Sequence, residues 1–162
     1  DEIAYNNHDV DDGLRAGLIS LDQLQDVALF RAQHAVVMAA YPDLSARRVI
    51  HETVRRIINV QVTDLVEKRR ANLAKAEPLN IDAVRQHPAA LIGFSADMHE
   101  QNLALKRFLR RELYQHYRVR RMSAKATRVI NALFDVFMND PRLLKPEQAA
   151  HVKRLETELG DR

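Results

Sequence analysis

The sequence predicts an all-α protein folded as a helical bundle, and three observations support that prediction. Only four Gly and five Pro occur among 162 residues, so helix-breaking residues are scarce. Apolar residues recur at spacings of three and four, as expected for helices with one buried face. Strand-like alternation is scarce, and residues 58–62, which do alternate, sit inside a much longer helical pattern. With 46% hydrophobic residues, the chain has enough apolar content to fold.

The first helices are predicted from apolar spacing and from capping residues. One helix runs over about residues 1–15, and its end is loosened by two glycines, Gly13 and Gly17. Ser20 and Gln23 form a capping-box pair that opens a second helix, which the spacing extends to residue 40. A Tyr-Pro-Asp break at residues 41–43 then ends it.

The middle of the chain is predicted to hold two helices separated by a loop. Asp43 is expected to cap a long helix over about residues 44–74. Residues 77–88 form a loop with one short turn, because their periodicity is lost and prolines appear. Ser95 caps the next helix, with Asp97 in its first turn. The buried face of that helix is predicted to hold Met98, Leu105, Phe108, Leu109 and Leu113.

The last third of the chain is predicted to bend and then continue as two helices. The bend falls at residues 116–117, and a helix follows over residues 119–138. Asp140 and Pro141 end that helix, and Pro146 starts a final polar one over residues 147–159. The inward residues of the first of these helices are predicted to be Met122, Val129, Ile130, Leu133, Phe134 and Phe137.

The composition also excludes several classes of protein. There is no Cys, so disulfides, thiol chemistry and Cys-type zinc sites are excluded. No apolar run approaches the ~20 residues that a membrane span needs. We therefore expect a cytoplasmic protein without a membrane partner.

The charged residues are distributed unevenly. Residues 1–26 hold seven Asp or Glu and one Arg, whereas residues 106–128 hold nine Lys or Arg and one Glu. This pattern suits a cation together with a polyanion such as a phosphate chain, and it equally suits two solvated faces. The basic cluster, with tyrosines nearby, also fits the backbone of single-stranded DNA.

Three side chains of the first helix lie one above another. Asp1, Tyr5 and Asp9 are spaced i, i+4, i+8, on the side opposite Ile3 and Val10. This row is either the solvated side of an amphipathic helix or the wall of a pocket. Asp1 and Asp9 are about 12 Å apart along the helix, so they cannot easily share one metal ion. Lys106, Arg110 and Tyr114 form a similar row, which is either a phosphate clamp or a solvated basic face.

Residues 1–18, DEIAYNNHDVDDGLRAGL, closely resemble the last metal-ligand helix of deoxyguanosinetriphosphate triphosphohydrolase-like proteins of the HD superfamily. Four later segments resemble the same family in the same order: residues 93–98, 101–106, 113–119 and 140–144. The resemblance implies the C-terminal part of an HD-domain phosphohydrolase fold. Residues 1–41 would end the HD catalytic core, and residues 42–162 would form a C-terminal helical region. We therefore expect the chain to be a piece of a longer protein.

The resemblance also implies roles for particular residues. Asp1 would be the final ligand of a divalent metal ion such as Mg²⁺ or Mn²⁺. The other three ligands lie upstream in the family, so the His8-Asp9 pair is not the superfamily's metal-binding pair. This chain would then contain no catalytic residue of its own and would not retain the metal alone. Tyr5 would pack on the deoxyribose of the substrate, and Asp9 would bind its 3′-hydroxyl.

The second half of the chain would complete the substrate contacts. Lys106 would contact the triphosphate, and Tyr114 with Gln115 would lie near the sugar or base. The implied reaction converts a dNTP, most simply a dGTP-like one, to deoxynucleoside and triphosphate through attack by a metal-activated water. The family often forms homo-oligomers, and residues 1–162 alone are expected to be inactive. The alternative is a helical nucleic-acid-binding or regulatory module that uses the basic cluster of residues 106–128.

Overall fold

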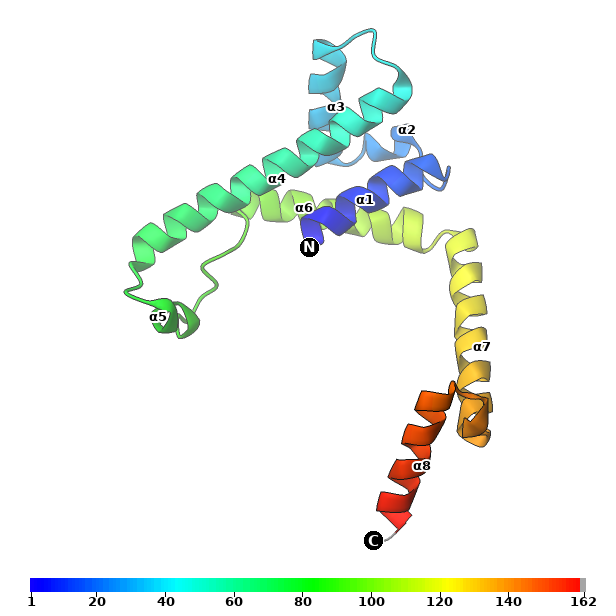
Figure 1. Cartoon of the computed structure of the whole chain (residues 1–162). Coiled ribbons are helices and arrows are strands. Elements are labelled where there is room, and N and C mark those ends of the chain that lie inside the picture. The colour runs from blue at the N-terminus through cyan, green and yellow to red at the C-terminus, as the bar shows by residue number, and fades with distance from the viewer. Residues whose placement is uncertain (161–162) are drawn as a thin grey trace. The chain divides into compact units, whose positions relative to one another are not determined.

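The computed structural model describes residues 1–160, and these residues form helices and no strand (Figure 1). The all-α prediction is therefore confirmed. The chain divides into two compact units, the first over residues 1–116 and the second from Tyr117 onward. The division expected at residue 42, which concerns two regions of a longer protein, stays a prediction.

The helices follow one another with short connections. The first unit contains α1 (Glu2–Arg15), α2 (Leu21–Leu24), α3 (Ala28–Ala40), α4 (Ala46–Ala76), α5 (Ile81–Arg85), α6 (Ala96–Phe108) and the π-helical η1 (Leu109–Tyr114). The second contains α7 (Tyr117–Asn139), the 3₁₀ turn η2 (Pro141–Leu143) and α8 (Pro146–Gly160). None of the helices described is long and apolar enough to cross a membrane.

The helix predicted over residues 21–40 is two helices. The capping box is confirmed, because Ser20 accepts from the Gln23 backbone while the Gln23 side chain accepts from the Ser20 backbone. However, α2 ends after one turn, and α3 begins after an extended residue, Val27. The break has a packing reason: on one unbroken helix the apolar residues of this segment would spread over roughly 220°, wider than a single buried stripe. All four become buried in the broken arrangement: Leu24, Val27, Leu29 and Phe30.

The starts of α4 and α6 depend on different caps. Ser45, not Asp43, occupies the N-cap of α4, so the predicted cap of this helix is wrong. Ser95 caps α6 as predicted, with its hydroxyl accepting from the Met98 backbone at 3.2 Å. The carboxylate of Asp64 on α4 accepts from the Ser95 backbone at 2.9 Å and from its hydroxyl at 2.6 Å. These bonds join the start of α6 to the middle of α4.

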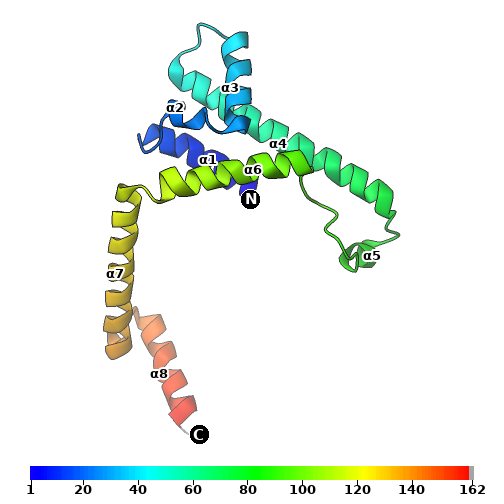
Figure 2. The ribbon, with the colours of Figure 1, turned by 180° about the vertical axis from the view of Figure 1, so that it is seen from behind.

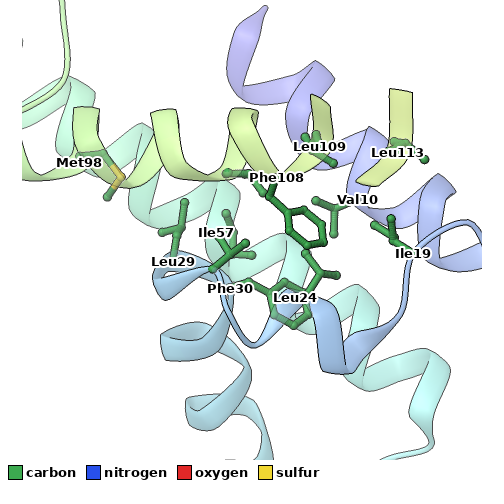
Figure 3. Close-up of a cluster of buried hydrophobic side chains, with 12 residues drawn as sticks. Val10, Ile19, Leu24, Leu29, Phe30, Ile57, Met98, Phe108, Leu109 and Leu113 are labelled. Atoms are coloured by element: carbon green, nitrogen blue, oxygen red, sulfur yellow. The ribbon is translucent and has the colours of Figure 1, made fainter. Parts of the chain in front are cut away.

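The hydrophobic core lies where α1, α2, α3, α4 and α6–η1 meet (Figure 3). The five residues predicted for the buried face after Ser95 are all buried, which confirms that face. Gly13 does not loosen the end of α1; it is buried inside the helix. A Cβ added there would lie 2.9 Å from Cδ1 of Ile19 and 3.2 Å from Cδ1 of Leu113. Gly17, with φ of 64°, does occupy the turn after α1, where a left-handed backbone favours glycine.

The apolar stripe of α7 is exposed in this structure. The helix itself and its end at Asp140 are confirmed, but neither α7 nor α8 contains a buried residue among those described. The predicted inward positions of Met122, Val129, Ile130, Leu133 and Phe134 are therefore wrong for this chain, and Phe137 is only half-buried. The reason is that the described part of the second unit consists of α7, η2 and a short polar α8, which are too few elements to cover the stripe.

Candidate functional site

Several side-chain contacts join α1 to α6–η1, and two of them involve predicted site residues. The Lys106 ammonium lies 3.2 Å from the Glu2 carboxylate, and the Tyr114 hydroxyl donates to the carboxylate of Asp9. Glu2 precedes Asp9 on α1, and Lys106 precedes Tyr114 on α6–η1, so the two elements run parallel. Figures 1 and 2 both show them side by side. Along α1 the contacts are about 10 Å apart. The acidic first helix thus meets the start of the basic cluster.

The π-helical segment accounts for the spacing of these contacts. Glu2 and Asp9 are separated by seven residues, whereas Lys106 and Tyr114 are separated by eight. A π-helical turn accommodates an extra residue, and such turns occur often at functional sites. The segment keeps Leu109 and Leu113 in the core.

The remaining predicted site residues are exposed. Asp1 occupies the N-cap position of α1, and its side chain makes no capping hydrogen bond. The Tyr5 side chain is 70% exposed, one turn along the same helix. Gln115 is exposed directly after η1. The structure therefore brings together Asp9 with Tyr114 and Lys106 with the start of α1, and it leaves Tyr5 and Gln115 open to solvent.

The contact with Asp9 raises the pKa of Tyr114 to about 12. The hydrogen bond to the carboxylate is the largest cause, followed by burial and by the negative charge of Asp9. A raised pKa favours the protonated phenol in the folded state. The stability that the contact adds is therefore fully present below the ordinary tyrosine pKa of about 10 and is lost as pH rises through about 12.

We predict that Asp9→Asn returns the Tyr114 pKa toward its ordinary value, because the amide removes the charge that favours the phenol. Absorbance of tyrosinate, followed during an alkaline titration, measures this directly. One of the four tyrosines should titrate late in the unaltered chain and earlier in the variant. Tyr114→Phe is the control, since it should abolish the late phase. An unchanged titration in Asp9→Asn would contradict the contact.

The residues described do not complete a metal site. No group of three or more His, Asp or Glu side chains among residues 1–160 lies close enough to hold a metal ion. Asp1 is one exposed carboxylate at the start of α1, and Asp9 is two turns away and bonded to Tyr114. At most one ligand position therefore fits Asp1, and any further ligands would have to come from outside the residues that the structure describes.

A buried network of amide side chains lies behind these contacts. Asn7 donates to Gln61 at 2.7 Å, and Gln61 donates to Asn102 at 3.0 Å. Asn102 donates to the Glu2 carboxylate at 2.6 Å and accepts from Asn6 at 3.3 Å. The four amide residues are at most 7% exposed. The network joins α1, α4 and α6, and it ends on the carboxylate that holds Lys106.

Sequence reasoning missed these amides as part of the site, although a signal was present. Asn7 falls within the stripe formed by Ile3 and Val10, and Asn102 falls between Met98 and Leu105 on a buried face. A polar side chain inside an apolar stripe needs a buried hydrogen-bond partner. Gln61 likewise falls between Ile57 and Leu65 along the stripe of α4. Three such positions on three helices indicate one shared network.

One part of the chain matches a known family of protein domains. Residues 92–162 match the family model of the phosphohydrolase-associated domain, which covers α6, η1 and the second unit. The residues described are all-α, and this match assigns a phosphohydrolase-associated domain to the second half of the chain.

Relatives with the same name are found in several bacteria. Deoxyguanosinetriphosphate triphosphohydrolase-like proteins from Ralstonia pickettii, Thiobacillus denitrificans and Bordetella pertussis are 56%, 52% and 50% identical to this chain. The matches cover 93%, 93% and 91% of this chain but only 38%, 40% and 38% of those proteins. The chain is thus homologous to one part of the deoxyguanosinetriphosphate triphosphohydrolase-like proteins, and it spans about 38% of their length.

Proposed function

We propose that this chain forms part of a metal-dependent dNTP triphosphohydrolase, which converts a dGTP-like dNTP to deoxynucleoside and triphosphate. The observation that supports it most is the parallel pairing of α1 with α6–η1. This pairing puts Asp9 with Tyr114 at one end and Lys106 with the start of α1 at the other. The pairing occurs in a chain whose relatives are named for this activity.

Each end of the pairing suits a different part of a nucleotide. Asp9 and Tyr114 offer an acceptor and a hydroxyl, which match a sugar hydroxyl. Lys106 offers a cation for the triphosphate, and it would help to offset the charge on that leaving group. The exposed ring of Tyr5 lies between them along α1, where it would pack on the deoxyribose. Gln115 would reach the sugar or base from the turn after η1.

We assign Asp1 one ligand position of a divalent metal ion such as Mg²⁺ or Mn²⁺ in the full-length protein. Carboxylate oxygen is the ligand that these ions prefer. Since the described residues do not complete such a site, activation of the attacking water would need metal ligands beyond them. We further propose that the full-length protein is cytoplasmic and homo-oligomeric.

Product analysis of the full-length protein tests the proposed reaction. The purified protein is incubated with each of the four dNTPs and a divalent metal ion, and the products are separated and identified by phosphorus NMR. The proposal expects intact triphosphate and deoxynucleoside. Release of phosphate or pyrophosphate with a nucleotide product would overturn it, as would the absence of hydrolysis with every dNTP.

The chain of residues 1–162 alone should show no turnover. Asp1 is the one metal ligand proposed within it, and a catalytic metal site needs several protein ligands. The same phosphorus NMR assay, run with this chain at high concentration, checks the prediction. Metal-dependent release of triphosphate by the chain alone would show that it contains a complete site.

A second candidate function is binding of single-stranded DNA through the basic cluster of residues 106–128. One observation favours it: most cations of α7 lie on the side opposite its apolar stripe. All of them are exposed: Arg118, Arg120, Arg121, Lys125 and Arg128. Contacts to phosphates make such binding strongly salt-dependent. Fluorescence anisotropy with a labelled oligonucleotide at low and high salt tests it, and no binding at low salt would exclude it.

A further inference from the structure

The orientation of every amide in the buried network is determined by one backbone group. Asn7 Nδ2 donates to the carbonyl oxygen of Ile3 at 2.8 Å, and an amide oxygen could not take that place. The same Nδ2 faces Gln61, so Gln61 must present its oxygen to Asn7 and its nitrogen to Asn102. Asn102 must in turn present its oxygen to Gln61 and its nitrogen to Glu2.

The network therefore ends on a group that must accept hydrogen bonds. The Glu2 carboxylate meets this requirement, because Oε1 accepts from Asn102 Nδ2 at 2.6 Å and lies 3.2 Å from Lys106 Nζ. Glu2 is half exposed, yet one of its oxygens is held by a side chain that is only 2% exposed. A long surface carboxylate is thus fixed from the interior of the first unit.

Most exposed ion pairs lack such support. Glu52 and Arg55 on α4 form a closer pair, at 2.6 Å, but both belong to one helix and neither has a hydrogen bond to the core among the residues described. An exposed pair of that kind holds its side chains weakly, because ordering two long side chains costs entropy. The Glu2–Lys106 pair joins two helices, and the core side of Glu2 has already been ordered by Asn102.

From this arrangement we propose that Glu2, held by Asn102, which Gln61 orients in turn, is a positioning residue that keeps the Lys106 ammonium in place to receive a triphosphate group. The proposal rests on the proposed function, in which Lys106 contacts the triphosphate. Glu2 acts through Lys106 and does not contact the substrate. Pre-ordering Lys106 lowers the cost of immobilising it when the polyanion binds.

Two substitutions at Glu2 separate positioning from charge. Glu2→Gln keeps an oxygen that can accept from Asn102 and Lys106, whereas Glu2→Ala removes it. In the full-length protein, Glu2→Ala should raise KM for the dNTP about three- to tenfold with kcat changed less than about twofold. Glu2→Gln should restore KM to within about twofold of the unaltered protein. Because Glu2 is exposed, these variants avoid the folding risk of a substitution at buried Asn102.

A double-variant cycle tests whether Glu2 acts through Lys106. Once Lys106→Ala is present, adding Glu2→Ala should change KM no further, since there is no ammonium left to position. Glu52→Ala is the matched control, because it breaks the closer carboxylate–guanidinium pair on α4 and should leave KM unchanged.

Three outcomes would overturn the proposal. A KM for Glu2→Ala that is equal to or lower than that of the unaltered protein would show that Glu2 does not help Lys106 to bind phosphate. Equal effects of Glu2→Ala and Glu2→Gln would show that only charge matters. Additive effects of the two alanine substitutions would show that Glu2 acts independently of Lys106.

Calorimetric titration with inorganic triphosphate separates failure of this proposal from failure of the proposed function. If the full-length protein hydrolyses no dNTP, the proposed function fails. The positioning role is then judged by triphosphate binding alone, which should weaken about three- to tenfold in Glu2→Ala and not in Glu2→Gln. Equal binding by all three proteins, or no binding by the unaltered protein, would overturn the positioning role.

Discussion

Asp1→Ala should lower metal-dependent release of triphosphate by the full-length protein at least about 100-fold. The physical reason is that loss of one carboxylate ligand weakens binding of the metal ion and disturbs the geometry of its remaining ligands. The side chain is exposed at the N-cap position of α1 and makes no capping bond, so its removal should not unfold the protein. The assay is the rate of triphosphate release as a function of metal concentration, with far-UV circular dichroism to verify folding.

Asp82→Ala is the matched control for this prediction. Asp82 is also an exposed carboxylate in the first turn of a helix, and its partner is a neighbouring arginine, Arg85, at 3.2 Å. Its loss should leave the rate unchanged. An Asp1→Ala variant as active as Asp82→Ala, with the same metal dependence, would refute the ligand assignment.

Leu24→Ala should reduce the free energy of unfolding by about 2–5 kcal/mol. Leu24 is fully buried in the core between α1, α3 and α6, as Figure 3 shows, so its truncation removes buried apolar area and leaves a cavity. Urea unfolding followed by circular dichroism measures the change as a shift of the midpoint.

The same substitution at an exposed leucine, Leu79, tests whether the loss of stability depends on burial of the side chain. Leu79 is 95% exposed before α5, so Leu79→Ala should change the free energy of unfolding by less than about 0.5 kcal/mol. Similar effects of the two substitutions would contradict the core described here.

Much of the fold follows from local signals in the sequence. The capping box at Ser20, the cap at Ser95 and the break at residues 41–43 each depend on side chains within a few residues of one another. Such signals predicted α1, α4, α6, α7 and α8 to within a few residues. The assignment of residues 58–62 to a helix is confirmed, because these residues lie inside α4. The helical spacing of the apolar residues on both sides of them had predicted it.

Tertiary contacts explain the features of the fold that local signals did not predict. The break between α2 and α3 exists because four neighbouring apolar residues all enter one core, which spacing along one helix cannot express. The burial of the α7 stripe was predicted wrongly because an amphipathic pattern shows which side is apolar and not whether a partner covers it.

The candidate site also combines features that are visible in the sequence with contacts that only the structure shows. The row of Asp1, Tyr5 and Asp9 is a property of one helix and was visible in the sequence. The pairing of Asp9 with Tyr114 connects residues 105 positions apart, and the bond from Asn102 to Glu2 spans 100 positions. Distances of this kind depend on how helices pack, so the role proposed for Glu2 could be inferred only from the structure.

A crystal structure of the full-length protein with a bound, slowly hydrolysed dNTP analogue would test the central claim most directly. The account predicts the sugar 3′-hydroxyl within about 3.2 Å of the Asp9 carboxylate, with Lys106 on the triphosphate and the Tyr5 ring against the deoxyribose. A nucleotide bound elsewhere, with Asp9, Tyr5 and Lys106 free of contact to it, would contradict the claim that α1 and α6–η1 form one wall of the substrate site.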